Sequence, residues 1–299
     1  MTPHRESRLA RLLGGLLAAA GRLPLGWLQR LGRAGGWLAG ALGSRAARVA
    51  ARNLALCFPE LPAKERARLR RDALAATAQT ALECARLWTR PATENVALVR
   101  EVHGLPLFEQ ALAAPAGLIV AAPHLGNWEL LNQWLASRTP LTIVYRAPRQ
   151  PVLEGVLRRG RGVPGVTQLR AEPGAVRGLL RTLQGGGVLG ILPDQQPKQG
   201  EGVFAPFFGV PALTMTLLPR LAQRTGATVL FAFAARRGQG DGFDVHLLPA
   251  PAGLDHPDPE RAAAALNAGV EACARQVPAQ YQWTYKRFGR QPGGAASPY

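Results

Sequence analysis

The segment Pro-His-Leu-Gly-Asn-Trp-Glu, which contains His124, brings together two side chains that can move a proton. It follows the apolar run 117–122, which has the length and composition of a buried strand. We expect His124 to lie on the turn after that strand and Asn127 to begin a helix as its N-cap. Glu129, five residues after His124, would then lie in the first helical turn, where the two side chains can converge.

A carboxylate beside an imidazole can make the histidine a general base. A hydrogen bond to one ring nitrogen fixes the tautomer, leaves the other nitrogen as an acceptor and stabilises the imidazolium that forms. The amino end of a helix adds backbone N–H donors near a developing negative charge. This arrangement is typical of acyl-transfer enzymes. The alternative is that a single histidine near a strand end is only structural. The remaining histidines have no comparable acidic partner in a strand-end turn: His4, His103, His246 and His256.

A sheet is needed to position these residues, and the surrounding sequence alternates strand-like and helix-like patterns. Strands are expected at 117–122, 141–145, 165–169, 187–192, 228–234 and 243–248. Helices are expected at 62–90, 105–114, 127–137, 151–160, 173–184, 213–225 and 258–277. The alternation predicts an α/β fold, with a mostly parallel central sheet flanked by helices. Ligands of such sheets bind beyond the carboxyl ends of the strands, where His124 is expected.

The first 53 residues carry nine arginines and a single acid, with leucines and tryptophans between them. No block reaches the ~18 uninterrupted apolar residues of a spanning helix. The pattern favours helices that lie in a membrane interface, against anionic lipid. The alternative is an ordinary helical hairpin packed on the catalytic domain, which we expect at 54–292. The Gly- and Pro-containing end, 293–299, is expected to be a loose tail.

The charge of the chain indicates an anionic partner. There are 36 basic and 19 acidic residues, a net charge of +17, and only three of the basic residues are lysines. Arginine forks suit phosphates and carboxylates. Nucleic acid is disfavoured as the partner, because aromatic residues are only 6%, no nucleic-acid-binding signature is present and the arginines are spread along the chain. Three separated cysteines give no disulfide framework or zinc motif, and we expect no metal and no cofactor.

The segment HLGNWE and three later blocks resemble the bacterial lipid A late acyltransferases, the lauroyl/myristoyl transferase family. The later blocks are 145–162, 183–214 and 281–292, and the likeness extends over residues 40–292. The resemblance implies an enzyme that moves a fatty acyl chain from acyl carrier protein to a hydroxyl of a Kdo-lipid A precursor. It also implies a location at the cytoplasmic face of the bacterial inner membrane, and direct attack of the hydroxyl oxygen on the thioester, without a covalent intermediate.

The same resemblance implies roles for single side chains. His124 would be the general base and Glu129 would orient it, while Arg161 would hold the oxyanion or a phosphate. Asp194 and Gln195, a strand-end Asp-Gln pair, either contact the substrate or form a buried structural pair. Further substrate contacts are expected from Asn127, Arg146 and Arg158.

Two alternatives stay open at this stage. The same chemistry could serve another acceptor, such as a glycerophospholipid, an ornithine lipid or a different glycolipid. The chain could also be an inactive, membrane-associated homologue. A basic surface suits the family's substrates in particular, because acyl carrier proteins are acidic and lipid A precursors carry phosphates and acidic sugars.

Overall fold

The computed structural model describes residues 8–145, 151–172, 174–198 and 200–299. At its centre is a sheet whose strands are β1 Val99–His103, β2 Leu118–Ala121, β3 Leu141–Tyr145, β4 Val166–Arg170, β5 Val188–Ile191, β8 Thr228–Arg236 and β9 Phe243–Pro249. In the described part of the chain their order is β1-β9-β8-β2-β5-β3-β4. Neighbouring strands run parallel, except for the antiparallel pair β8 and β9. The predicted α/β fold with a mostly parallel sheet is confirmed.

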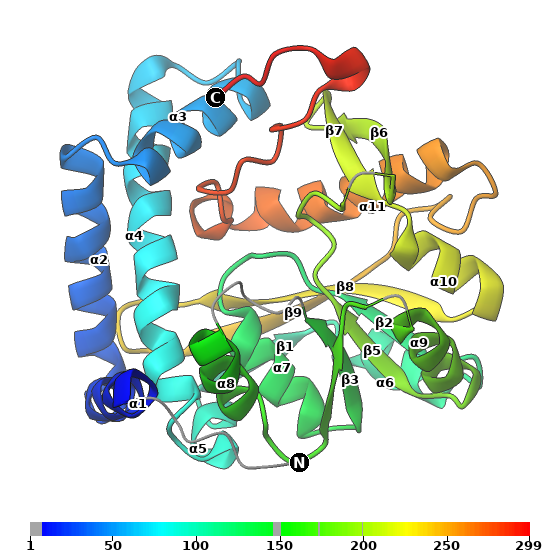
Figure 1. Cartoon of the computed structure of the whole chain (residues 1–299), viewed down its shortest axis with the longest axis horizontal. Helices are drawn as coiled ribbons and strands as arrows, with labels where there is room; N and C mark the ends of the chain where they lie inside the picture. Colours follow the sequence, from blue (N-terminus) through cyan, green and yellow to red (C-terminus); the bar gives the residue numbers. More distant parts are fainter. Residues whose placement is uncertain (1–7, 146–150, 173, 199) are drawn as a thin grey trace.

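Helices cover both faces of this sheet (Figure 1). One face carries α6 Leu105–Ala113 and α7 Trp128–Ala136, and the other carries α9 Ala175–Gln184, α10 Leu217–Thr225 and α11 Pro259–Gln276. Side chains of the fully buried strand β2 alternate between the two cores. Ile119 and Ala121 pack into the core with α9, α10 and α11, whereas Leu118 and Val120 pack into the core with α6 and α7. The carboxyl end of β2 is therefore enclosed from both sides.

The amino-terminal helices stand beside the sheet and are α1 Arg8–Gly21, α2 Leu25–Ala41, α3 Arg45–Cys57, α4 Ala63–Leu87 and the short α5 Ala92–Val96. In Figure 1, α2 (blue) lies along α4 (cyan). Gly32 and Gly36 permit this approach, since a Cβ on Gly36 would lie 2.4 Å from the Leu74 carbonyl oxygen. Across the described residues, no helix has both the length and the hydropathy needed to cross a bilayer. The domain boundary expected at residue 53 falls inside α3.

Other elements differ from the sequence-based expectation. The helix expected at 213–225 begins only at Leu217, because the preceding residues form β7 Val210–Met215, which pairs with β6 Gly202–Phe207 in a hairpin. The edge strand β1 was not predicted, because its side chains are half-buried or exposed and it has no apolar run. The short helix α8 Pro151–Gly160 lies where it was expected.

The carboxyl end is held against α3, where a loose tail was expected. The Phe288 amide donates to the Tyr299 hydroxyl at 3.1 Å, and that hydroxyl in turn donates to the Asn53 side chain. Arg52 also donates to the Pro298 carbonyl at 3.0 Å. The last residues of the chain therefore pack against a helix that precedes the sheet.

Candidate active site

The register of two neighbouring strands brings His124 and Asp194 together. In the parallel pair β2–β5, Ala121 lies opposite Ile191. His124 comes three residues after Ala121, and Asp194 comes three residues after Ile191. Because parallel strands end at the same edge of a sheet, equal offsets from paired residues place the two side chains side by side. This is the edge where α/β sheets bind ligands.

Asp194 holds both the ring and the backbone of His124. Its Oδ1 lies 2.8 Å from His124 Nδ1, and its Oδ2 accepts from the His124 amide at 2.9 Å. Burial alone would raise the pKa of the Asp194 carboxyl, but the charge of His124 and its two hydrogen bonds keep that pKa below its ordinary value. Since an ionised carboxylate only accepts, Nδ1 carries a hydrogen, and in the neutral imidazole Nε2 is then the nitrogen with the free lone pair. The side-chain amide nitrogen of Gln195 lies 3.2 Å from Nε2.

The turn after His124 is fixed by its backbone. Gly126 has φ +59°, and a Cβ there would lie 2.0 Å from the Ala234 carbonyl oxygen, so only glycine fits. Asn127 begins α7 as predicted, because its Oδ1 accepts from the Leu130 amide at 3.1 Å. The predicted contact of Asn127 with substrate is wrong. Its side chain is 0% exposed, and its Nδ2 donates to Glu83 Oε2 at 2.9 Å.

Glu129 does not pair with the His124 ring, contrary to the sequence-based expectation. Its carboxylate accepts from Arg161 Nε at 2.9 and 3.1 Å, and from Trp88 Nε1 at 3.3 Å. The physical reason is that Glu129 lies on the first turn of α7 on the side of α4 and the end of α8, whereas Asp194 on the adjacent strand end reaches Nδ1. Burial alone would lower the pKa of Arg161, but the charge and hydrogen bonds of Glu129 raise it.

His124 and Arg161 line one cavity of about 790 Å³. Its polar wall includes His124, Arg161 and Gln195, and the Trp128 ring stands edge-on to the imidazole with 4.9 Å between centroids. Its apolar wall includes Ile143, Leu157, Val176, Leu179, Leu180 and Leu221. An oriented base at the wall of an apolar cavity can act on a substrate with a hydrocarbon chain.

The other predicted residues have different outcomes. Gln195 lines the cavity, while Asp194 is 3% exposed, does not line it and contacts the lining residue His124. Arg158 is exposed on α8 and is not among the lining residues, so its predicted substrate contact is not supported by this structure. Arg146 lies outside the described residues. Within the described ranges, no three His, Cys or acidic side chains are grouped as metal ligands.

Sequence reasoning missed Asp194 as the partner of the ring, although a signal was present. Both strands end in the same way, with a proline followed at once by a polar residue: Ala-Pro-His after β2 and Leu-Pro-Asp after β5. Two matching strand ends indicate that the polar residues meet if the strands are neighbours. The sequence does not order the strands across the sheet, so this condition became visible only in the fold.

Comparison with known proteins identifies the family of the chain. The family described as bacterial lipid A biosynthesis acyltransferase matches residues 5–290. The chain is 29% identical to the lipid A biosynthesis lauroyltransferase of Escherichia coli (strain K12), over 95% of this chain and 92% of that protein. It is 28% identical to the palmitoleoyltransferase of lipid A biosynthesis from the same strain, over 93% and 90%. A phosphatidylinositol mannoside acyltransferase of Mycobacterium tuberculosis (strain CDC 1551 / Oshkosh) is 29% identical over 50% of this chain and 48% of that protein.

The matched range contains the whole sheet, the strand ends that carry His124 and Asp194, and the helices that enclose the cavity. The chain is therefore an enzyme of the transferase class, and it belongs to the bacterial lipid A biosynthesis acyltransferase family.

Proposed function

We propose that this enzyme transfers a fatty acyl chain from the thioester of acyl carrier protein to a hydroxyl of a Kdo-lipid A precursor, with His124 as general base. The observation that carries this proposal is the pairing of His124 with the buried carboxylate of Asp194 at the wall of a largely apolar cavity. Family membership supports acyl transfer in lipid A biosynthesis, and the paired imidazole supplies a chemical route to it.

The proposed reaction needs one base and no covalent intermediate. His124 Nε2 takes the proton of the acceptor hydroxyl, and the oxygen attacks the thioester carbonyl carbon. The tetrahedral intermediate collapses, the C–S bond breaks, and the leaving thiolate takes the proton back from the imidazolium. Asp194 stabilises that imidazolium from the Nδ1 side. The Gln195 amide, now 3.2 Å from Nε2, must give way to the acceptor hydroxyl.

Arg161 is proposed to stabilise negative charge in the same cavity. Glu129 and the cavity wall hold its guanidinium, and its side chain is 20% exposed, so it can still meet a ligand. A guanidinium fixed in this way suits either the oxyanion of the tetrahedral intermediate or a phosphate of the acceptor. Glu129 is thus assigned to orienting Arg161 and not the imidazole.

An acidic carrier is the proposed donor because basic side chains outnumber acidic ones around the cavity. Arg161, Lys198, Arg220 and Arg224 line it, against Glu172 and Glu201. Helices α9 and α10 pack against each other and contain no acidic residue. They expose four arginines that form no ion pair within the described part of the chain: Arg177, Arg181, Arg220 and Arg224. Arg220 and Arg224 also line the cavity. A surface with an excess of one charge speeds encounter with a partner of opposite charge.

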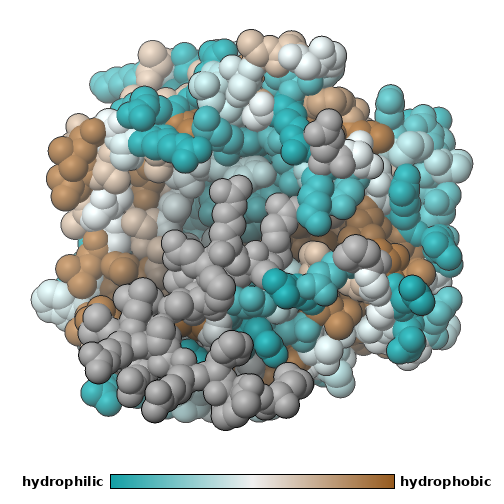
Figure 2. Space-filling model, viewed as in Figure 1, coloured by the Kyte–Doolittle hydropathy of each residue, from teal (hydrophilic) through white to brown (hydrophobic). Residues whose placement is uncertain are grey.

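We further propose attachment to the cytoplasmic face of the bacterial inner membrane through α2, which packs one face on α4 and exposes apolar side chains on the other. Trp27, Leu31 and Leu38 lie on one side of the helix by spacing and are 55%, 51% and 60% exposed. Figure 2 shows hydrophobic side chains (brown) on the flank where α2 lies. Arg30 and Arg33 are exposed beside them. Apolar side chains flanked by arginines suit the interface of an anionic bilayer.

A second acceptor has a specific observation in its favour. The match to a phosphatidylinositol mannoside acyltransferase over half of this chain shows that a related sequence occurs in a protein named for another glycolipid. The same base and cavity would serve such an acceptor without change. The two acceptors therefore have to be compared directly in one assay.

The test uses the purified full chain with acylated carrier protein and two acceptors, a tetra-acyl Kdo-lipid A precursor and a mannosylated phosphatidylinositol. We expect mass spectrometry to find the added acyl chain on the lipid A precursor, and His124→Ala to lower the rate by about 10²- to 10⁴-fold. Transfer only to the mannolipid would overturn the acceptor. Equal rates in wild type and His124→Ala would overturn the assignment of His124 as general base.

A further inference from the structure

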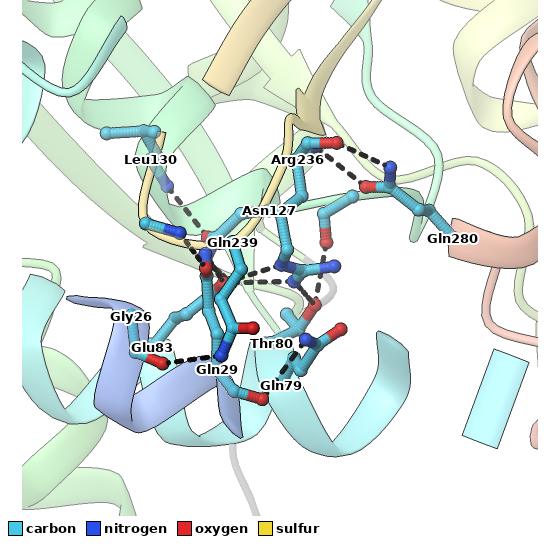
Figure 3. Close-up of polar contacts among 12 residues, drawn as sticks. Gly26, Gln29, Gln79, Thr80, Glu83, Asn127, Leu130, Arg236, Gln239 and Gln280 are labelled. Atoms are coloured by element: carbon cyan, nitrogen blue, oxygen red, sulfur yellow. Dashed lines mark hydrogen bonds and ion pairs between the residues drawn. The ribbon is translucent and has the colours of Figure 1, made fainter. Parts of the chain in front are cut away.

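A second group of buried polar side chains joins α4 and the end of β8 to Asn127 at the start of α7 (Figure 3). Its centre is the ion pair of Glu83 on α4 with Arg236 at the end of β8. Arg236 Nε lies 2.6 Å from Glu83 Oε1, and a second guanidinium nitrogen lies 2.7 Å from Oε2. The side chains are 1% and 5% exposed. Burying two charged side chains costs free energy unless hydrogen bonds satisfy both groups. The hydrogen-bond partners of this pair therefore show which elements it holds together.

The pair reaches the turn of the proposed active site at two points. Glu83 Oε2 accepts from Asn127 Nδ2 at 2.9 Å. Arg236 donates to the Thr80 hydroxyl at 2.9 Å, and that hydroxyl donates to the Gly126 carbonyl at 3.0 Å. Asn127 and Gly126 are the two residues that join His124 and Leu125 to the first turn of α7, which carries Trp128 and Glu129.

The same pair extends to α2. Glu83 Oε1 also accepts from Gln29 Nε2 at 2.8 Å, and Gln29 is 0% exposed on the inner face of α2. Gln29 Oε1 accepts from the Gly240 amide at 2.8 Å, in the loop that joins β8 to β9. Burial alone would raise the pKa of Glu83, but the charge of Arg236 and the three donors keep it below its ordinary value, so the carboxyl is ionised and accepts from every side.

We propose that Glu83 and Arg236 are positioning residues of this enzyme, which set the amino end of α7 against the catalytic histidine without touching the substrate. Neither Glu83 nor Arg236 lines the cavity of His124. Their effect passes through Asn127 and Gly126 to Trp128, whose ring borders the imidazole, and to Glu129, which holds Arg161. This inference rests on the proposed function, because the geometry that it protects is that of the proposed base.

The test compares two double variants of the full chain that both lack the charge pair. In Glu83→Leu/Arg236→Met the apolar pair leaves Asn127 Nδ2 without an acceptor, while in Glu83→Gln/Arg236→Met the amide oxygen can still accept. Replacing both charges avoids a single unpaired buried ion, but in the Leu variant Gln29 Nε2 also loses its acceptor. We therefore expect both variants to fold, with unfolding midpoints within about 10 °C of wild type. We expect kcat to fall about 10- to 100-fold in the Leu variant, with little change in KM, and to recover at least in part in the Gln variant.

A matched control removes another buried asparagine. Asn267 on α11 is 1% exposed and donates to the Pro206 carbonyl and the Thr214 hydroxyl, both at 2.9 Å, far along the chain from the turn. Asn267→Ala should lose stability and keep kcat within about twofold. If the Leu variant also keeps kcat within about twofold while folded, or if Asn267→Ala loses as much, the pair is merely structural and the inference fails.

A second readout does not depend on acyl transfer. Hydrogen–deuterium exchange, measured by mass spectrometry on the same proteins, should be faster in residues 124–131 of the Leu variant and unchanged there in Asn267→Ala. If wild type transfers no acyl chain to any acceptor, the proposed function fails, and this exchange pattern alone decides whether the pair holds the turn. Unchanged exchange at 124–131 in the Leu variant overturns the inference.

Discussion

Replacing Asp194 with asparagine should disable the proposed base while leaving the fold intact. The carboxylate accepts twice from His124, from Nδ1 at 2.8 Å and from the backbone amide at 2.9 Å. An asparagine has one oxygen and one NH₂ group in the same places. The backbone amide can only donate, so it claims the oxygen, and the NH₂ group then faces Nδ1. Nδ1 must become the acceptor, and the ring hydrogen moves to Nε2, the nitrogen that the reaction needs free.

The size of the effect follows from this change of tautomer. At the corresponding place in serine protease triads, an Asp-to-Asn change keeps the geometry and lowers kcat by about 10⁴-fold. General-base catalysis as a whole contributes about 10²- to 10⁴-fold. For Asp194→Asn we therefore expect a loss of kcat of about 10³- to 10⁴-fold, with KM changed by less than about threefold, because Asp194 is buried behind the histidine.

The assay measures initial rates of acyl transfer from acylated carrier protein to the tetra-acyl precursor, with the unfolding midpoint as a check of folding. Nitrogen NMR of ¹⁵N-histidine protein reports which ring nitrogen carries the hydrogen. The control is Glu129→Gln, which keeps the side-chain shape next to the turn but weakens the hold on Arg161. Its loss should be smaller, about 10- to 100-fold in kcat/KM, because one set of charge-assisted hydrogen bonds is weakened.

Two results would refute this reasoning. Asp194→Asn could keep its rate within about threefold of wild type, or its ring could keep the hydrogen on Nδ1; either outcome removes Asp194 as the residue that orients the base. A larger loss of kcat in Glu129→Gln than in Asp194→Asn would restore the role that the sequence alone suggested for Glu129.

Three further predictions concern the surface and the acid range. Arg220→Glu/Arg224→Glu should raise KM for acylated carrier protein at least about tenfold at low salt and less at high salt, but not KM for an acyl-pantetheine lacking the carrier. Trp27→Ser/Leu31→Ser should reduce co-flotation with phosphatidylglycerol vesicles at least about tenfold. Glu83 has a lowered pKa, so its contribution to stability is present above the ordinary value of 4.5 and is lost as pH falls through the lower folded value. The urea midpoint should therefore drop more steeply in acid for wild type than for the Leu/Met double variant described above.

Much of the architecture could be predicted because it depends on local patterns. Apolar runs of strand length and helical periodicity, taken in alternation, predicted the parallel sheet and its covering helices, and the position of Asn127 predicted the start of α7. The edge strand β1 was not predicted, because a half-exposed strand lacks a clear periodic pattern. The hairpin β6–β7 was not predicted either, because β7 leads directly into a helix and the two patterns merge.

The pairing of the histidine ring with a carboxylate was only half predictable. His124 could be singled out from its place after a buried strand, yet the nearest acid along the chain, Glu129, was the wrong partner for its ring. Distance along the chain favours Glu129, but distance in space favours Asp194, 70 residues away. The same reasoning explains why Glu83 and Arg236, 153 residues apart, drew no attention in the sequence.

The sequence by itself determined the class of fold, the histidine turn, the basic charge and the family likeness. Each of these depends on residue types, on short spacings or on blocks of sequence along the chain. Only the tertiary structure decided which acid orients the imidazole, which acid holds Arg161 and what supports the turn. The physical reason is that the order of strands in the sheet and the packing of α4 against it bring distant residues within hydrogen-bond distance, and neither is encoded by local periodicity.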